Sequence, residues 1–170
     1  MTHPPIQIVN DQDQSIGAAP LAEAYEKGLI HRVVFTFVED PSGKILLQKR
    51  GLNMHTYPGC WDISSAGHVD EGESYETAAK RELYEELGLS GLDLKEIASF
   101  RGDETHKGQL LKRFKRVYRV SVSPSTQFKL DPEEVSEVKW MKLADIKQLI
   151  VNHPDQVASG LTTSLDYYQP

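Results

Sequence analysis

The stretch GHVDEGESYETAAKRELYEELGL, residues 67–89, carries three glutamates within five consecutive positions. Ser74 is a favourable N-cap residue, and Gly88 is a favourable residue just after the last turn of a helix. We therefore predict a helix over 74–87. Apolar residues four positions apart in it would form a stripe that packs against the core: Ala79, Leu83 and Leu87.

The three glutamates of this helix, Glu82, Glu85 and Glu86, are three and four residues apart and would share one face. Like charges at this spacing cost roughly 0.2–0.5 kcal/mol even when the helix is exposed. A hard divalent cation would reverse the sign of that interaction, because Mg²⁺ and Mn²⁺ prefer carboxylate oxygens. The stretch therefore suggests a metal site, although an acidic face turned to water is the usual explanation of an isolated E-x-x-E-E.

The composition is typical of a single globular domain. The chain has 170 residues, of which 39% are hydrophobic and 26% are charged. A net charge of −6 argues against a general nucleic-acid or anionic-membrane surface and leaves a small phosphorylated ligand open. The single cysteine, Cys60, excludes an internal disulfide. We find neither the features of a secretion signal nor an apolar run of ~20 residues, so we expect a cytoplasmic protein. The sequence does not indicate its oligomeric state.

Strands and helices are predicted to alternate along the rest of the chain. IQIV and SIGAA flank a polar run as a strand hairpin, and PLAEAYEKG follows as a short helix. HRVVFTFVED and KILLQKR predict strands on either side of a turn, and WDISSAG predicts another short strand. Further strands are expected at 93–100, 114–122 and 135–141, and helices at 143–151 and 155–167. This order predicts an α/β fold with helices packed on sheet faces.

The opening stretch also fits the pattern G-x5-E-x7-R-E-U-x-E-E-x-G-U, where U is apolar, at every specified position. Chance would produce this match in a chain of this length on the order of 10⁻⁷ of the time. The stretch resembles the Nudix box, the signature of the Nudix hydrolase superfamily. The resemblance implies a Nudix-type α/β/α sandwich with a mixed sheet. We expect a single domain over 1–170, with an N-terminal hairpin and short helix (1–30), a core (31–151) and a C-terminal helix (152–170).

The resemblance to the Nudix box implies roles for individual residues. Four residues would hold Mg²⁺ or Mn²⁺ on a small-molecule diphosphate substrate: Gly67, through its carbonyl, and Glu82, Glu85 and Glu86. Glu85 or Glu86 would also act as the catalytic base, and Glu73 and Arg81 would form a structural ion pair. Arg50, which ends the strand KILLQKR, would contact the substrate phosphates. Metal ions suit this chemistry because they neutralise the growing charge of a diphosphate and lower the pKa of bound water.

Two further groups of charged residues lie outside the box. Four acids are candidates for a distant catalytic base, although we expect each to be a plain surface charge: Asp131, Glu133, Glu134 and Glu137. A basic run could attract phosphates, although its expected place is a solvated edge of the sheet: Lys112, Arg113, Lys115, Arg116 and Arg119. We do not expect a nucleic-acid surface there, because the chain is acidic and few aromatic residues interleave with the run.

A second resemblance concerns the isopentenyl-diphosphate isomerases, which share the Nudix fold. It rests on QIVNDQDQSIG, HRVVFTFVED, LLQKR and PGCWDISSAGH. Those isomerases bind metal through histidines, and His31 and His68 match two of them, so both are candidate metal ligands. The isomerases also carry a catalytic cysteine where this chain has Ala66, and Cys60 lies six residues earlier. We therefore expect a hydrolase that cleaves a diphosphate linked to another moiety, with an isomerase-like enzyme or a non-catalytic ligand sensor as alternatives.

Overall fold

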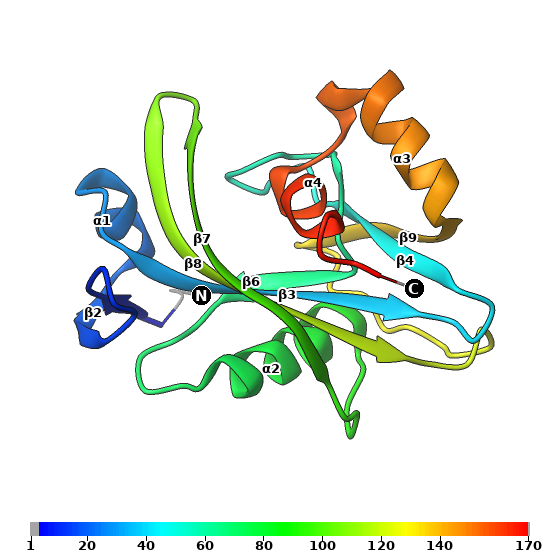
Figure 1. The fold of residues 1–170 in the computed structure, drawn as a ribbon, viewed down its shortest axis with the longest axis horizontal. Helices are drawn as coiled ribbons and strands as arrows, with labels where there is room; N and C mark the ends of the chain where they lie inside the picture. The colour runs from blue at the N-terminus through cyan, green and yellow to red at the C-terminus, as the bar shows by residue number, and fades with distance from the viewer. Residues whose placement is uncertain (1–3, 170) are drawn as a thin grey trace.

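One mixed sheet of nine strands organises the part of the chain that the structure describes (Figure 1). The computed structural model describes residues 4–169, so the ends of the predicted domain, residues 1–3 and 170, lie outside the described residues. The strands are β1 (Ile6–Val9), β2 (Ser15–Ala19), β3 (His31–Glu39), β4 (Lys44–Arg50), β5 (Trp61–Asp62), β6 (Ser65–His68), β7 (Lys95–His106), β8 (Gln109–Ser121) and β9 (Val135–Lys142). Strand β3 is central, because it pairs antiparallel with β1, β4 and β6 and parallel with β8.

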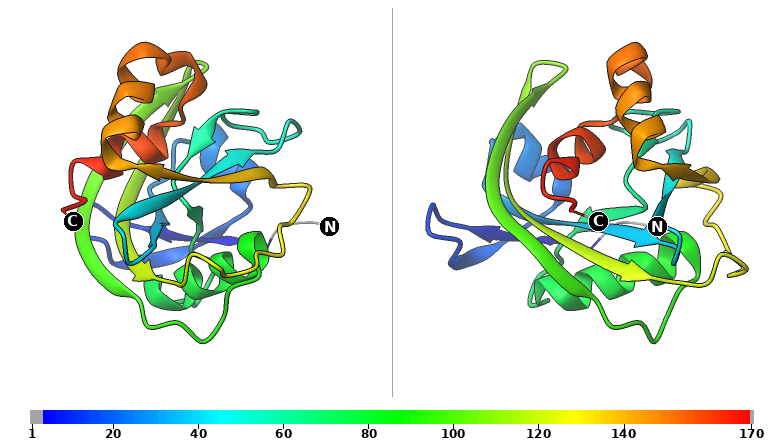
Figure 2. Two further views of the ribbon diagram at one scale, coloured as in Figure 1. Left: turned by 90° about the vertical axis from the view of Figure 1, so that its right-hand side faces the viewer. Right: turned by 45° about the vertical axis from the view of Figure 1, so that its right-hand side comes forward.

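Helices cover both faces of this sheet, which confirms the predicted α/β sandwich (Figures 1 and 2). The helices are α1 (Leu21–Glu26), α2 (Tyr75–Leu87), α3 (Leu143–Asn152) and α4 (Ser159–Leu165), with a 3-10 turn η1 (Pro154–Gln156) before α4. On one face, Leu83 and Leu87 of α2 join Leu46 of β4 in a buried cluster. On the other face, Ile146 of α3 and Leu161 of α4 pack with residues of β3. None of the described helices is long and apolar enough to cross a membrane.

Helix α2 begins and ends where the sequence predicts. The Ser74 hydroxyl accepts a hydrogen bond from the backbone N–H of Thr77 at 3.1 Å. Gly88 follows the last turn with a φ of 72°, a left-handed conformation that glycine adopts without a steric penalty. The predicted apolar stripe of Ala79, Leu83 and Leu87 is buried. Burying a leucine side chain stabilises a fold by roughly 1.5–3 kcal/mol, so this packing fixes the rotation of α2 and the direction of its glutamates.

Two predicted elements are divided in the structure. The segment WDISSAG forms two short strands rather than one, because β5 pairs with β4 whereas β6 pairs with β3. The helix predicted over 155–167 begins only at Ser159. Val157 stays extended in front of it because it forms an isolated bridge with Trp61, whose carbonyl accepts a hydrogen bond from the Ala158 N–H at 2.9 Å.

The expectation that the basic run lies at a solvated sheet edge is wrong. Strands β7 and β8 are longer than predicted and form a curved hairpin that turns at Lys107 and Gly108 (Figure 2). Strand β8 lies between β3 and β7, so it is an interior strand. Alternate residues of the run, Arg113 and Lys115, are buried. Their burial is possible because both contact the carboxylate of Glu104 on the neighbouring strand.

Candidate metal centre

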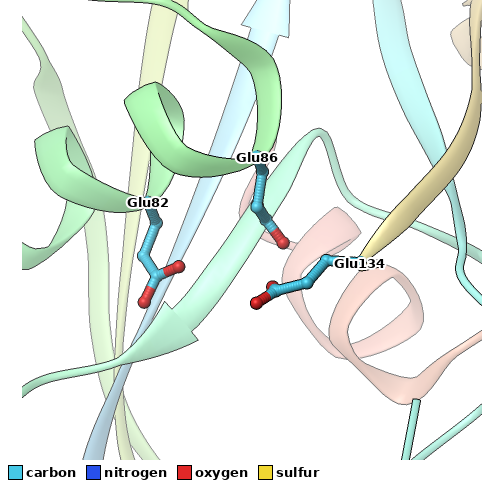
Figure 3. A group of neighbouring side chains, drawn as sticks. All are labelled: Glu82, Glu86 and Glu134. Carbon is cyan, nitrogen blue, oxygen red and sulfur yellow. The ribbon is translucent and has the colours of Figure 1, made fainter. Parts of the chain in front are cut away.

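Three glutamate side chains converge beside the sheet. Glu82 and Glu86 come from successive turns of α2, and Glu134 comes from the segment that leads into β9 (Figure 3). One carboxylate oxygen from each lies within 4.8 Å of the others. Carboxylates at this separation repel one another, and a hard divalent cation converts that repulsion into shared coordination. The three residues therefore form a candidate metal centre.

Glu86 is the most deeply buried residue of this centre. Its two carboxylate oxygens accept hydrogen bonds from Gln48 Nε2 at 3.2 Å and from the backbone N–H of Ala66 at 3.0 Å. Burial raises the pKa of Glu86 to about 7. Burial, together with the charge of Glu86, also raises the pKa of Glu82 well above its usual range. The metal-free pair therefore favours bound protons near neutral pH, and a divalent ion would displace them.

Strand β6 brings its backbone directly against Glu82. A Cβ added at Gly67 would lie 1.9 Å from Glu82 Oε1 and 2.0 Å from Glu82 Cδ, far closer than real Cβ contacts. Gly67 does not have the left-handed φ that favours glycine, so it is required here for space. The carboxylate of Glu82 thus fills the volume that any other residue at position 67 would need, next to the backbone predicted to offer a carbonyl ligand.

Arg81 connects the separate parts of the centre. Its Nε and Nη2 donate to the two carboxylate oxygens of Glu73 at 3.0 and 2.9 Å, the two-bond geometry of a strong arginine–carboxylate pair. Nη2 also donates to the backbone carbonyl of His68 at 2.9 Å. Nη1 donates to Glu82 at 2.8 Å and to Glu85 at 2.9 Å. Arg81 therefore holds the loop before α2, strand β6 and two acids of the helix in one arrangement.

The acidic centre opens into a cavity of about 640 Å³, a volume that suits a small-molecule ligand. One group of wall residues is charged and includes two of the three glutamates of the centre, Glu82 and Glu134, with Arg81, Glu85 and Asp131. A second group is aromatic, apolar and basic: Tyr25, Val33, Phe35, His55, Tyr57, His68 and Arg113. The cavity can therefore hold a ligand whose two parts differ in chemistry.

Known proteins resemble the chain over most of its length. The family model described as NUDIX domain matches residues 29–159. The chain belongs to the Nudix family. The matched residues include all three glutamates of the centre, so the candidate metal centre lies within the Nudix domain.

Two relatives and one solved structure illustrate this membership. Isopentenyl-diphosphate Delta-isomerase 2 of Photorhabdus laumondii is 36% identical over 149 residues, which cover 87% of this chain and 82% of that protein. An uncharacterized Nudix hydrolase of Pseudomonas aeruginosa is 37% identical over 137 residues, which cover 81% and 78%. A crystal structure of a protein from Deinococcus radiodurans has a TM-score of 0.81 at 23% identity and covers 97% of this chain and 99% of that one. The predicted Nudix fold, in the branch that resembles the isomerases, is confirmed.

Glu85 and Arg50, both predicted for the Nudix site, also line the cavity. The side chain of Glu85 is 52% exposed and accepts the hydrogen bond from Arg81. Arg50 is buried, and its guanidinium donates to the Thr56 carbonyl at 2.9 Å and to Asp62 at 3.2 Å. Arg50 thereby fixes the loop that follows β4. Its contact with substrate phosphates stays a prediction, as do the metal and base roles of Glu85.

His31 and His68 lie side by side, with ring centroids 5.4 Å apart. The Nδ1–H of His31 donates to the Leu29 carbonyl at 3.0 Å, so its Nε2 accepts from Arg113 Nε at 3.4 Å. Burial lowers the pKa of His31 to about 4. His68 Nε2 and Tyr25 Oη share a hydrogen bond at 3.2 Å. This geometry disfavours the predicted metal role of His31, because a metal on Nε2 would meet the positive guanidinium of Arg113.

Glu134 is the residue of the centre that the sequence interpretation placed elsewhere, as a surface charge. Its segment is held in place by backbone contacts: the Gly51 N–H donates to the Glu134 carbonyl at 2.7 Å, and the Asp131 N–H donates to the Glu86 carbonyl at 3.2 Å. These contacts join residues that are far apart in the sequence. The spacing of residues in the sequence does not reveal such contacts. The sequence indicated only that Glu134 is an acid just before a predicted strand.

Proposed function

We propose that this protein is a hydrolase that cleaves a diphosphate linked to another moiety, with Mg²⁺ or Mn²⁺ as cofactor. The observation that carries the proposal is the convergence of Glu82, Glu86 and Glu134, two of which, Glu82 and Glu134, line a ligand-sized cavity. Oxygen ligands in a negatively charged group suit hard divalent ions, whereas thiolates and imidazoles would suit zinc. A divalent ion held there would neutralise charge on the diphosphate oxygens and lower the pKa of the attacking water.

The residues around the centre have separate tasks in this proposal. Gln48 and the Ala66 N–H orient Glu86, and Arg81 orients Glu82. Glu85 faces the same cavity, is half exposed and can accept a proton from water. Glu86 is the other candidate base, although its pKa of about 7 belongs to the metal-free protein and a bound divalent ion would lower it. General-base catalysis of this kind typically contributes about 10²–10⁴-fold to the rate.

Isomerisation of a prenyl diphosphate is the second candidate, and relatives named as isopentenyl-diphosphate isomerases favour it. The site argues against it. Ala66 stands where the isomerases carry a catalytic cysteine, and its methyl group cannot exchange a proton with an alkene. The thiol of Cys60 lies on the loop after β4, 3.6 Å from the Asp155 carbonyl, and burial raises its pKa. A thiol of raised pKa outside the cavity wall is a poor substitute for the missing acid.

A hydrolysis screen tests the proposed reaction. The purified protein is offered a library of nucleoside, sugar, prenyl and coenzyme diphosphates with Mg²⁺, with Mn²⁺ or with EDTA, and released phosphate and nucleotide are measured. We expect turnover of at least one diphosphate with a divalent ion and background rates with EDTA. Turnover that persists unchanged in EDTA would contradict the proposal.

A further inference from the structure

Two buried cations face the same side of the interior strand β8. Arg113 and Lys115 are alternate residues of this strand, and they are 8% and 2% exposed. A buried charge is costly unless it is paired, so the partners of these two side chains decide what they can do.

Arg113 and Lys115 share one carboxylate. Arg113 Nη1 donates to Glu104 Oε1 at 2.8 Å, and Lys115 Nζ lies 3.7 Å from Glu104 Oε2. The neighbouring His31 adds no charge to this group, because its lowered pKa of about 4 leaves the ring neutral near pH 7. Burial lowers the pKa of Lys115, as expected for a cation whose charge is only partly compensated. With both side chains protonated, the group keeps an excess of one positive charge.

This positive group opens into the cavity beside the metal centre. Arg113, Tyr25 and His68 are all wall residues, and the Tyr25 hydroxyl accepts from Arg113 Nη2 at 3.1 Å while it shares a hydrogen bond with His68. His68 follows Gly67, which touches Glu82. The negative and positive groups are therefore neighbours in one cavity.

The guanidinium of Arg113 keeps donors for a ligand. Arginine has five N–H groups, and the hydrogen bonds to His31, Glu104 and Tyr25 each use one of them. Each terminal nitrogen thus carries a second N–H. The three bonds also hold the planar group in a fixed orientation, so little side-chain entropy would be lost when an anion binds.

We propose that Arg113, together with Tyr25 and His68, forms a second anion-binding subsite, which holds a further phosphate or carboxylate on the moiety attached to the diphosphate. This inference rests on the proposed function and narrows its substrate class. The diphosphate would lie at the three glutamates, and the far anionic group would lie at Arg113. Diphosphates that carry an uncharged prenyl or alkyl group would then be poor substrates.

A binding experiment without metal tests the subsite independently of hydrolysis. Inorganic phosphate and acetate are titrated by calorimetry into the protein in EDTA. We expect phosphate, acetate or both to bind the wild type, with Arg113→Met at least tenfold weaker. Lys112→Met, which removes the same charge from the adjacent residue, should stay within twofold. The double variant Glu82→Gln/Glu86→Gln should also retain binding, because the anion lies away from the glutamates.

The relative affinities identify the ligand group. Tighter binding of phosphate indicates a phosphorylated moiety, and tighter binding of acetate indicates a carboxylated one. Two results would overturn the subsite: no binding of either anion to the wild type, or equal binding by Arg113→Met. If no diphosphate is hydrolysed in the screen, the proposed hydrolase activity is contradicted. The anion titrations still test the subsite, because they do not depend on hydrolysis.

Two further measurements guard against misfolding of Arg113→Met. Arg113→Lys keeps the charge and loses the planar fork, so we expect affinity between those of the wild type and Arg113→Met. In the wild type, ¹⁵N-histidine NMR should show anion-induced shifts at His31 and His68 and none at His153, which is not a wall residue of the cavity. Shifts absent from both of these rings would contradict the proposed location even if an anion binds.

Discussion

The carboxylate of Glu82 occupies the space in which residue 67 would place a Cβ, and a Cβ in that position would lie 1.9 Å from Oε1. The absence of a side chain at Gly67 is therefore required for the position of Glu82. The glycine lets the helix acid reach the cavity at a depth where it meets Glu86 and Glu134.

Replacement of Gly67 by alanine should displace Glu82. We expect Gly67→Ala to weaken Mn²⁺ binding roughly tenfold or more and to lower the free energy of unfolding by about 1–3 kcal/mol, the usual cost of overpacking. Thermal unfolding and a metal titration measure the two effects. The double variant Gly67→Ala/Glu82→Asp shortens the acid and should recover part of the lost stability. Full metal affinity in Gly67→Ala would show that the contact is not required.

Glu134 and its neighbour Glu133 provide a matched pair. Glu134 points into the centre, whereas Glu133 is exposed. Glu134→Gln should weaken metal binding and reduce kcat/KM at least tenfold, because it removes a carboxylate ligand. Glu133→Gln removes the same charge and should stay within about twofold. Equal effects of the two substitutions would show that Glu134 contributes only its negative charge and is not a metal ligand.

The raised pKa of Glu86 predicts a pH dependence of stability in the metal-free protein. The folded chain binds a proton with a pKa of about 7, and the unfolded chain releases it near the usual pKa of 4.5. The folded state thus holds more protons between these values, so the free energy of unfolding falls as pH rises from 4.5 to 7, by on the order of 3 kcal/mol. Denaturant titrations in EDTA at pH 5 and pH 7.5 measure the change.

Glu86→Gln is the control for this pH dependence. It carries no titrating carboxyl at position 86, so its stability should change less between pH 5 and pH 7.5 than that of the wild type. Addition of Mg²⁺ at pH 7.5 should restore stability to the wild type, because the metal replaces the proton. A wild-type protein that gains stability across this range would refute the assigned environment of Glu86.

The presence of Ala66 predicts the outcome with isopentenyl diphosphate. We expect no dimethylallyl diphosphate above background in the presence of Mg²⁺, as measured by proton NMR. Cys60→Ala should leave hydrolysis of the true substrate within about twofold, because the thiol lies outside the proposed chemistry. Isomerisation by the wild type that disappears in Cys60→Ala would make Cys60 a displaced catalytic acid and reverse the choice between the two reactions.

Local sequence signals predicted the helix and part of the centre. The cap at Ser74, the glycine at 88 and the apolar stripe of α2 determine where this helix lies, and they place Glu82 and Glu86 on its inner side. Glu134 and Arg113 were misplaced, because their positions depend on which strands pair. The extra length of the β7–β8 hairpin brings Glu104 to Arg113, and this pairing turns an apparent surface charge into a buried one.

Direct measurement of metal binding is the sharpest test of the proposal that Glu82, Glu86 and Glu134 hold the catalytic divalent ion. Electron paramagnetic resonance counts free Mn²⁺ as it is titrated into the wild type, Glu86→Gln and the exposed control Glu133→Gln. We expect Mn²⁺ binding by the wild type and the control, and affinity at least tenfold lower in Glu86→Gln, because a carboxylate ligand is lost. Equal Mn²⁺ binding by a folded Glu86→Gln protein would contradict the proposed centre.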